Sequence, residues 1–185
     1  MSRESGRNVK GKLPWSSAVN FLLSLPQIGI KPRTLFDTAG QLIDEQKDRW
    51  KVVRRRTYQS VLAFDVFYKQ LDDKRPAFAT FFSNHVASSM HRYWAASFPK
   101  DYTETNLPPE YFETFAGEIF FTMKKADDMV RQLVSFVDRN QDYSLWILSS
   151  MGQEATIAKK ISTQLYITDP ARFMQQLGVG AGQWQ

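Results

Sequence analysis

The sequence of 185 residues contains no cysteine and only two histidines. Without cysteine it has no disulfide scaffold, thiolate zinc site, iron–sulfur cluster or cysteine nucleophile. It also lacks an apolar run near the roughly 20 residues that a membrane-spanning helix needs, and its polar, basic residues 1–12 do not resemble a signal peptide. Since 43% of the residues are hydrophobic and 14% aromatic, we expect a globular, cytoplasmic protein.

Several short catalytic motifs are also missing. There is no phosphate-binding loop of the Walker type, no glycine-rich dinucleotide fingerprint and no Gly-x-Ser-x-Gly nucleophile elbow. Function therefore has to be sought in less standard groups of polar residues.

The charge is unevenly distributed along the chain. The 24 Lys and Arg exceed the 19 Asp and Glu by five, and residues 1–56 alone have 12 basic against 5 acidic residues. This excess peaks in the basic cluster, which we define as Lys51, Arg54, Arg55 and Arg56. Such a cluster can bind nucleic acid or an anionic membrane surface. A solvated helix face is the favoured explanation, so a nucleic-acid partner is not expected.

Hydrophobic periodicity predicts two regions. Residues 1–75 form a basic, all-helical N-terminal arm, with a tail at 1–12 and an amphipathic helix at 48–71. Residues 76–185 contain short β-prone apolar runs at 77–83, 143–148 and 159–168, and a long amphipathic helix at 110–139. A strand, a long helix and a second strand in succession are typical of a βαβ unit. The sequence therefore predicts an α/β fold in which long helices cover a partial parallel sheet.

Polar residues follow two of these predicted strands, and the carboxyl ends of parallel strands are where α/β proteins usually bind ligands. The two histidines follow the first strand, six residues apart. That spacing is about 240° on a helix, so a regular helix cannot present both to one metal ion. A structural role for either histidine is an equal alternative. The candidate site residues are Asn84, His85, His91, Arg92, Ser149, Ser150 and Gln153.

Two segments carry a family resemblance. Residues 78–94 (FATFFSNHVASSMHRYW) and 146–153 (WILSSMGQ) resemble the later part of the alkaline-phosphatase-like superfamily. The similar branch contains predicted phosphohydrolases or phosphomutases related to type I phosphodiesterases. The resemblance implies a small phosphate or related ester as substrate, two divalent metals such as Zn or Mn, and a Ser or Thr nucleophile.

The chain departs from the metal-binding motifs of that superfamily. In the Asp-x-x-x-His motif, His91 is retained as a metal ligand but Ala87 replaces the aspartate. In the Ser-Asp-His-Gly motif, Ser150 and Met151 replace the aspartate and histidine. Alanine offers no ligand atom, and methionine sulfur is softer than the nitrogen and oxygen that these metals prefer.

These departures leave three functions open. The first is that the chain is a fragment or a reduced relative of a phosphohydrolase, since the nucleophile of that superfamily has no counterpart here. A fragment of a longer polypeptide is favoured, because two or three strands make a thin sheet for so many apolar helices. Alternatively, the chain is a non-catalytic binding module without the metal site, or it binds anionic surfaces through the basic cluster. In the first two, the substrate-binding residues are Asn84, His85, Arg92, Ser149, Ser150 and Gln153.

Overall fold

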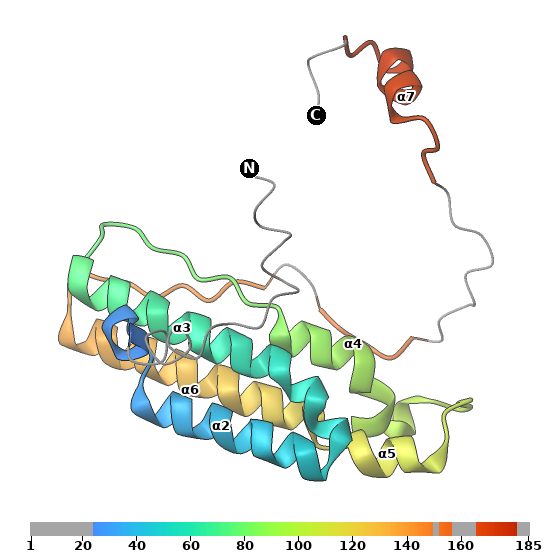
Figure 1. Cartoon of the computed structure of the whole chain (residues 1–185), viewed down its shortest axis with the longest axis horizontal. Helices are drawn as coiled ribbons and strands as arrows, with labels where there is room; N and C mark the ends of the chain where they lie inside the picture. The colour runs from blue at the N-terminus through green and yellow to red at the C-terminus, as the bar shows by residue number, and fades with distance from the viewer. Residues whose placement is uncertain (1–23, 150–151, 157–165, 181–185) are drawn as a thin grey trace, which may run out of the picture. The chain divides into compact units, whose positions relative to one another are not determined.

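The computed structural model describes residues 24–149, 152–156 and 166–180. Residues 24–155 belong to one compact unit and residues 156–180 to a second. The first unit contains all but one of the helices shown in Figure 1. Its elements are a helical turn at residues 24–28, α2 (Pro32–Lys47), η1 (Arg49–Arg54), α3 (Arg55–Lys74), α4 (His85–Ser97), η2 (Pro99–Asp101), α5 (Pro109–Phe115) and α6 (Glu118–Arg139).

The second unit contains one short helix, α7 (Pro170–Gln176). Its first turn is capped by the side chain of Asp169, which accepts a hydrogen bond from the backbone N–H of Arg172. An oxygen acceptor at this position satisfies one of the unpaired N–H groups of a helix start.

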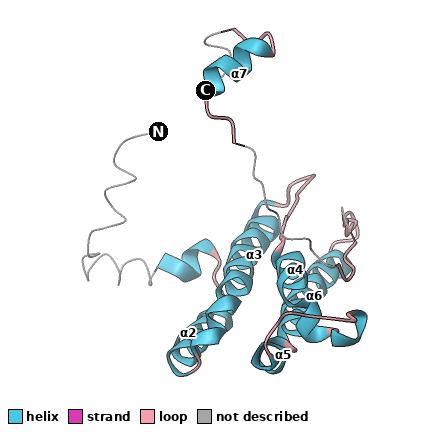
Figure 2. Cartoon of the chain, turned by 90° about the vertical axis from the view of Figure 1, so that its right-hand side faces the viewer, coloured by secondary structure: helices cyan, strands magenta, loops and turns pink. Residues whose placement is uncertain are grey.

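The α/β prediction is wrong for the described residues, which contain helices and loops but no strand or sheet (Figure 2). Residues 77–83 and 143–148, predicted as strands, are irregular and form no β-ladder within the described part of the chain. A strand needs a neighbour to accept and donate its main-chain hydrogen bonds. The third predicted strand, at 159–168, lies mostly outside the described residues, as does the predicted tail at 1–12.

The two long predicted helices are present but divided. The first is a 3₁₀ turn, η1, followed by α3, and the second is broken at Ala116 and Gly117 into α5 and α6. α3 ends at Arg75, whose φ of 47° lies in the left-handed region. The following Pro76 disfavours continued helix, because its ring restricts the residue before it.

The core lies where α3 packs against α6 and α4, with α2 on the other side of α3 (Figure 2). Its most deeply buried large apolar side chains are Phe64 of α3 and Ile119 and Phe136 of α6. Tyr68 and Phe136 form an edge-to-face contact between these two helices. This packing fixes α3 and α4 as the two walls of the cavity described below.

Close contact with α3 also requires glycine before α2. Gly29 has φ of 109°, and a Cβ atom there would lie 2.5 Å from Cβ of Lys69. Only glycine avoids both the left-handed penalty and this clash. The approach allows the backbone N–H of Lys31 to donate to the buried Asp65 carboxylate at 3.0 Å.

None of the helices within the described residues combines the length and the apolar character that crossing a bilayer requires.

Candidate functional site

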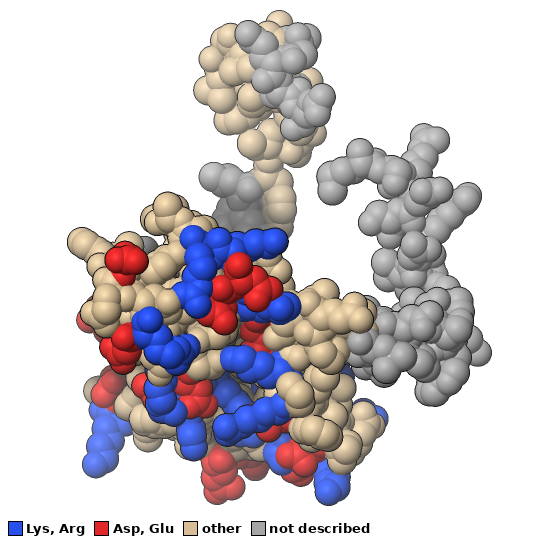
Figure 3. Space-filling view, turned by 90° about the vertical axis from the view of Figure 1, so that its left-hand side faces the viewer, with Lys and Arg blue, Asp and Glu red and all other residues tan. Residues whose placement is uncertain are grey.

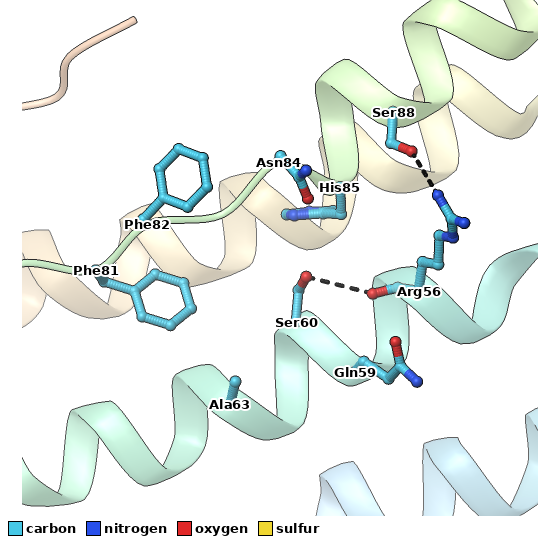
Figure 4. Close-up of a pocket in the computed structure, with 9 residues that line it drawn as sticks. All are labelled: Arg56, Gln59, Ser60, Ala63, Phe81, Phe82, Asn84, His85 and Ser88. Atoms are coloured by element: carbon cyan, nitrogen blue, oxygen red, sulfur yellow. Dashed lines mark hydrogen bonds between the residues drawn. The ribbon is translucent and has the colours of Figure 1, made fainter. Parts of the chain in front are cut away.

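A cavity of about 360 Å³ lies between α3 and the start of α4 (Figure 4). Its volume falls within the range of small-molecule sites, about 300–1,000 Å³. Side chains of α3 form one wall, and the extended segment that leads into α4 forms the other. The lining residues are Arg56, Gln59, Ser60, Ala63, Phe81, Phe82, Asn84, His85 and Ser88.

The α3 wall follows from helical spacing. Residues 56, 59, 60 and 63 lie three or four positions apart, which places them on one face of the helix. Opposite them, Asn84 is the N-cap residue of α4, and its side chain makes no capping hydrogen bond. Asn84 and Ser88 therefore bring an amide and a hydroxyl to the positively polarised first turn of α4.

His85 is buried at the inner end of this wall. Its Nδ1 lies 2.6 Å from the hydroxyl of Ser83, which also hydrogen-bonds Ser60 at 3.2 Å. Its Nε2 has no hydrogen-bond partner among the described residues. Burial lowers the pKa of His85 below its ordinary value of 6.5. The nearby backbone of Thr122 acts in the opposite direction, although it forms no hydrogen bond with Nε2.

The lowered pKa of His85 predicts a pH dependence of stability. In the unfolded chain this histidine takes up a proton near pH 6.5, whereas in the folded chain it does so only at a lower pH. The free energy of unfolding should therefore fall as the pH drops from above 6.5 through the lowered pKa of the folded state. His85→Gln should remove this component, and the exposed His91→Gln should keep it. Urea unfolding at a series of pH values measures the slopes. Equal slopes in wild type and His85→Gln would contradict the assignment.

The basic cluster is largely neutralised by ion pairs. Lys51 pairs with Asp44 and Asp48, at 3.5 and 2.8 Å. Arg54 pairs with Glu118, and Arg55 pairs with Glu45. On the face shown in Figure 3, basic and acidic side chains are likewise interspersed. The cluster does not form the continuous basic stripe that a nucleic-acid or membrane surface would require.

Arg56 differs from its neighbours. Within the described residues it has no Asp or Glu at ion-pair distance, and its Nη1 donates to the Ser88 hydroxyl across the cavity at 3.3 Å. The backbone carbonyl of Arg56 accepts a hydrogen bond from Ser60. An exposed guanidinium group thus stands at the cavity among neutral hydroxyl and amide groups.

The predicted site residues near α4 fall at or beside this cavity. Asn84 and His85 line it, and Arg92 lines a small adjoining cavity together with His85 and Ser88. His91 is exposed, because α4 is a regular helix that turns the two histidines in different directions.

The predicted residues after the second apolar run are not part of the cavity wall. Ser149 is exposed and Gln153 is half-buried, where its amide donates to the backbone carbonyl of Glu154. Ser150 lies outside the described residues, as does Met151.

The donor groups of the described residues do not fit the divalent metals that the resemblance implies. No three His, Asp or Glu side chains in this part of the chain come together at a spacing that could hold a metal ion. The cavity itself offers one imidazole with hydroxyls, two amides and a guanidinium group. A positively charged guanidinium group favours an anion over a cation.

Sequence reasoning missed the α3 wall of the cavity. Ser88 lies within residues 78–94, the segment that carries the family resemblance. Arg56 stands out only when the acidic partners of Arg54 and Arg55 are known, because Arg56 has none among the described residues. Those partners are 64 and 10 residues away along the chain.

Comparisons of this chain with protein-family models, with curated proteins and with solved structures find no match.

Proposed function

We propose that this chain binds a phosphate group, inorganic or as a small phosphate ester, in the cavity between α3 and α4. The proposal rests on the position of Arg56. Its guanidinium group borders the cavity and has no carboxylate at ion-pair distance in the described residues. Arginine binds phosphate oxygens through two parallel N–H groups, which makes it the common choice for such ligands.

The remaining polar groups suit the same ligand. Ser60 and Ser88 supply hydroxyl donors, and Asn84 supplies an amide. The first backbone N–H groups of α4, a helix of 13 residues, carry partial positive charge that favours an anion. Arg92, in the adjoining cavity, adds a second cation on the α4 side.

The apolar part of the wall leaves space for an ester group. Ala63, Phe81 and Phe82 line the cavity beside its polar end. Phe81 is held in place by ring contacts with Phe64 and Phe67, at centroid distances of 5.4 and 5.2 Å. A ligand with a phosphate at one end and an apolar group at the other would match this division.

Isothermal titration calorimetry with inorganic phosphate tests the proposal. The wild-type chain should bind, and Arg56→Gln should weaken binding about tenfold or more because a charge-assisted hydrogen-bond pair is lost. Arg33→Gln is the matched control, since Arg33 is an exposed arginine on α2 outside the cavity. Absent binding by wild type, or equal losses in both variants, would contradict the site.

The donor set favours binding over metal-dependent hydrolysis. We therefore expect 4-nitrophenyl phosphate incubated with the chain and Zn or Mn to be recovered unchanged. Release of phosphate that chelation abolishes and that His91→Ala reduces would favour the hydrolase instead. His91→Ala should have no effect on phosphate binding, because His91 does not line the cavity.

A further inference from the structure

Residues 77–83 and 144–148 lie in two irregular segments that carry exposed apolar side chains, and we call these two segments together the extended face. Both start at the same end of the α3 and α6 pair, where the hydroxyl of Tyr143 donates to the backbone carbonyl of Pro76 at 2.9 Å. In Figure 1 both segments run from this end towards α4. The large apolar side chains of the face are 69% to 88% exposed and are Phe78, Phe82, Trp146, Ile147 and Leu148.

The main chain of the extended face forms no β-ladder among the described residues. Within the described part of the chain, no main-chain N–H or C=O group of residues 77–83 or 144–148 makes a hydrogen bond. An extended segment of this kind presents the same groups as the edge strand of a sheet. Natural edges are usually protected by charge or proline, yet residues 77–83 and 143–149 contain neither.

We infer that the occupant of the extended face is a second copy of this chain, added edge to edge through an intermolecular β-ladder. The same uncharged segments are present on each copy, so a two-fold axis can bring the segments of one copy against those of the other. No like charges meet across such an interface, because neither segment carries a charged side chain.

The exposed area also suits a dimer. An aromatic side chain buries 150–250 Å² when covered, so the three rings of the face offer roughly 500 Å² before Ile147 and Leu148 are included. Monomers rarely expose larger continuous apolar patches than about 300–600 Å². A standard interface takes about 800 Å² from each partner. The five apolar side chains and the main chain between them offer an area of this order.

Light scattering coupled to size exclusion tests the inference on the full 185-residue chain. The wild type should form a dimer, and infrared spectra should show a β-sheet signal that grows with the dimer fraction. Phe78→Lys and Trp146→Lys should shift the chain to monomer, because each places a charge on the face. Thr80→Pro should do the same by removing a main-chain donor at an exposed position.

Phe36→Lys is the matched control, since Phe36 is a 77% exposed phenylalanine on α2, away from the extended face. It should remain dimeric, and circular dichroism should show unchanged helix content in every variant. A monomeric wild-type chain would overturn the inference and leave the face to a different polypeptide. A dimer without a β signal, higher oligomers without a dimer, or a dimer that survives Phe78→Lys and Trp146→Lys would overturn it too. The extended face shares Phe81 and Phe82 with the phosphate cavity, but none of these variants alters a cavity-lining residue, so phosphate titration of each variant tests that proposal separately.

Discussion

Replacing Arg54 with methionine is expected to lower the free energy of unfolding by about 3–5 kcal/mol, the cost of leaving a buried charge without its partner. Glu118 is almost fully buried at the start of α6, with its side chain 3% exposed. Arg54 donates to both of its carboxylate oxygens, from Nε and Nη2, at 2.5–3.1 Å. The same guanidinium group lies 4.3 Å from the centre of the Phe121 ring. The pair therefore joins η1 to α6 inside the protein.

Two further variants separate this effect from a general loss of charge. Arg131→Met removes an exposed arginine paired with Asp127 and Asp128, and should change stability by at most about 1 kcal/mol. Arg54→Met combined with Glu118→Leu should recover most of the loss, because no unpaired carboxylate then remains. Urea unfolding followed by circular dichroism measures all three. If Arg54→Met alone cost no more than Arg131→Met, the pair would be unimportant to folding.

Most of the helices could be predicted because the apolar spacing that indicates a helix lies within a short stretch of sequence. Apolar residues at spacings of three and four located α3 and α6, and Phe64 and Leu71 of α3 are buried as expected. The breaks could not be located in this way. The apolar stripe continues from Phe112 through Phe115 to Ile119, and the interruption at Gly117 does not disturb its period.

The sheet was predicted from residues whose composition is β-prone but whose pairing is not local. The apolar and aromatic side chains of residues 77–83 and 143–148 favour strands, but both segments are irregular in the structure. Strand pairing depends on what lies beside each segment, and the described residues provide no neighbour in register. Composition therefore predicted strands and an α/β architecture that the described residues do not form.

The candidate site was likewise predicted only in part. Asn84 and His85 were predicted as site residues because they follow an apolar run that was interpreted as a strand of a parallel sheet. The structure has no strand there, yet both residues line the cavity. Ser149 and Gln153 were identified by the same reasoning and lie outside it. Which arginine stays unpaired depends on contacts across the fold, so the role that we assign to Arg56 had no local signal.

Phe64→Ala is the second variant with a large expected effect, a loss of about 3–5 kcal/mol in the free energy of unfolding. Phe64 is 1% exposed and contacts the rings of Phe67, Tyr68 and Phe81 at centroid distances of 5.4–6.2 Å. Truncation leaves a cavity that these side chains cannot fill without leaving their own contacts. Phe36→Ala, at an exposed position, should cost less than about 0.5 kcal/mol under the same urea titration.

The same variant also connects the core to the proposed ligand site. Phe81 lines the cavity from one side and rests on Phe64 from the other, so losing the Phe64 ring removes support from the cavity wall. Below the unfolding transition, Phe64→Ala should therefore bind phosphate more weakly than wild type, whereas Phe64→Leu should retain most stability and most binding. Unchanged phosphate affinity in a destabilised Phe64→Ala chain would show that the polar end of the cavity, with Arg56 and Ser88, holds the ligand without help from the aromatic wall.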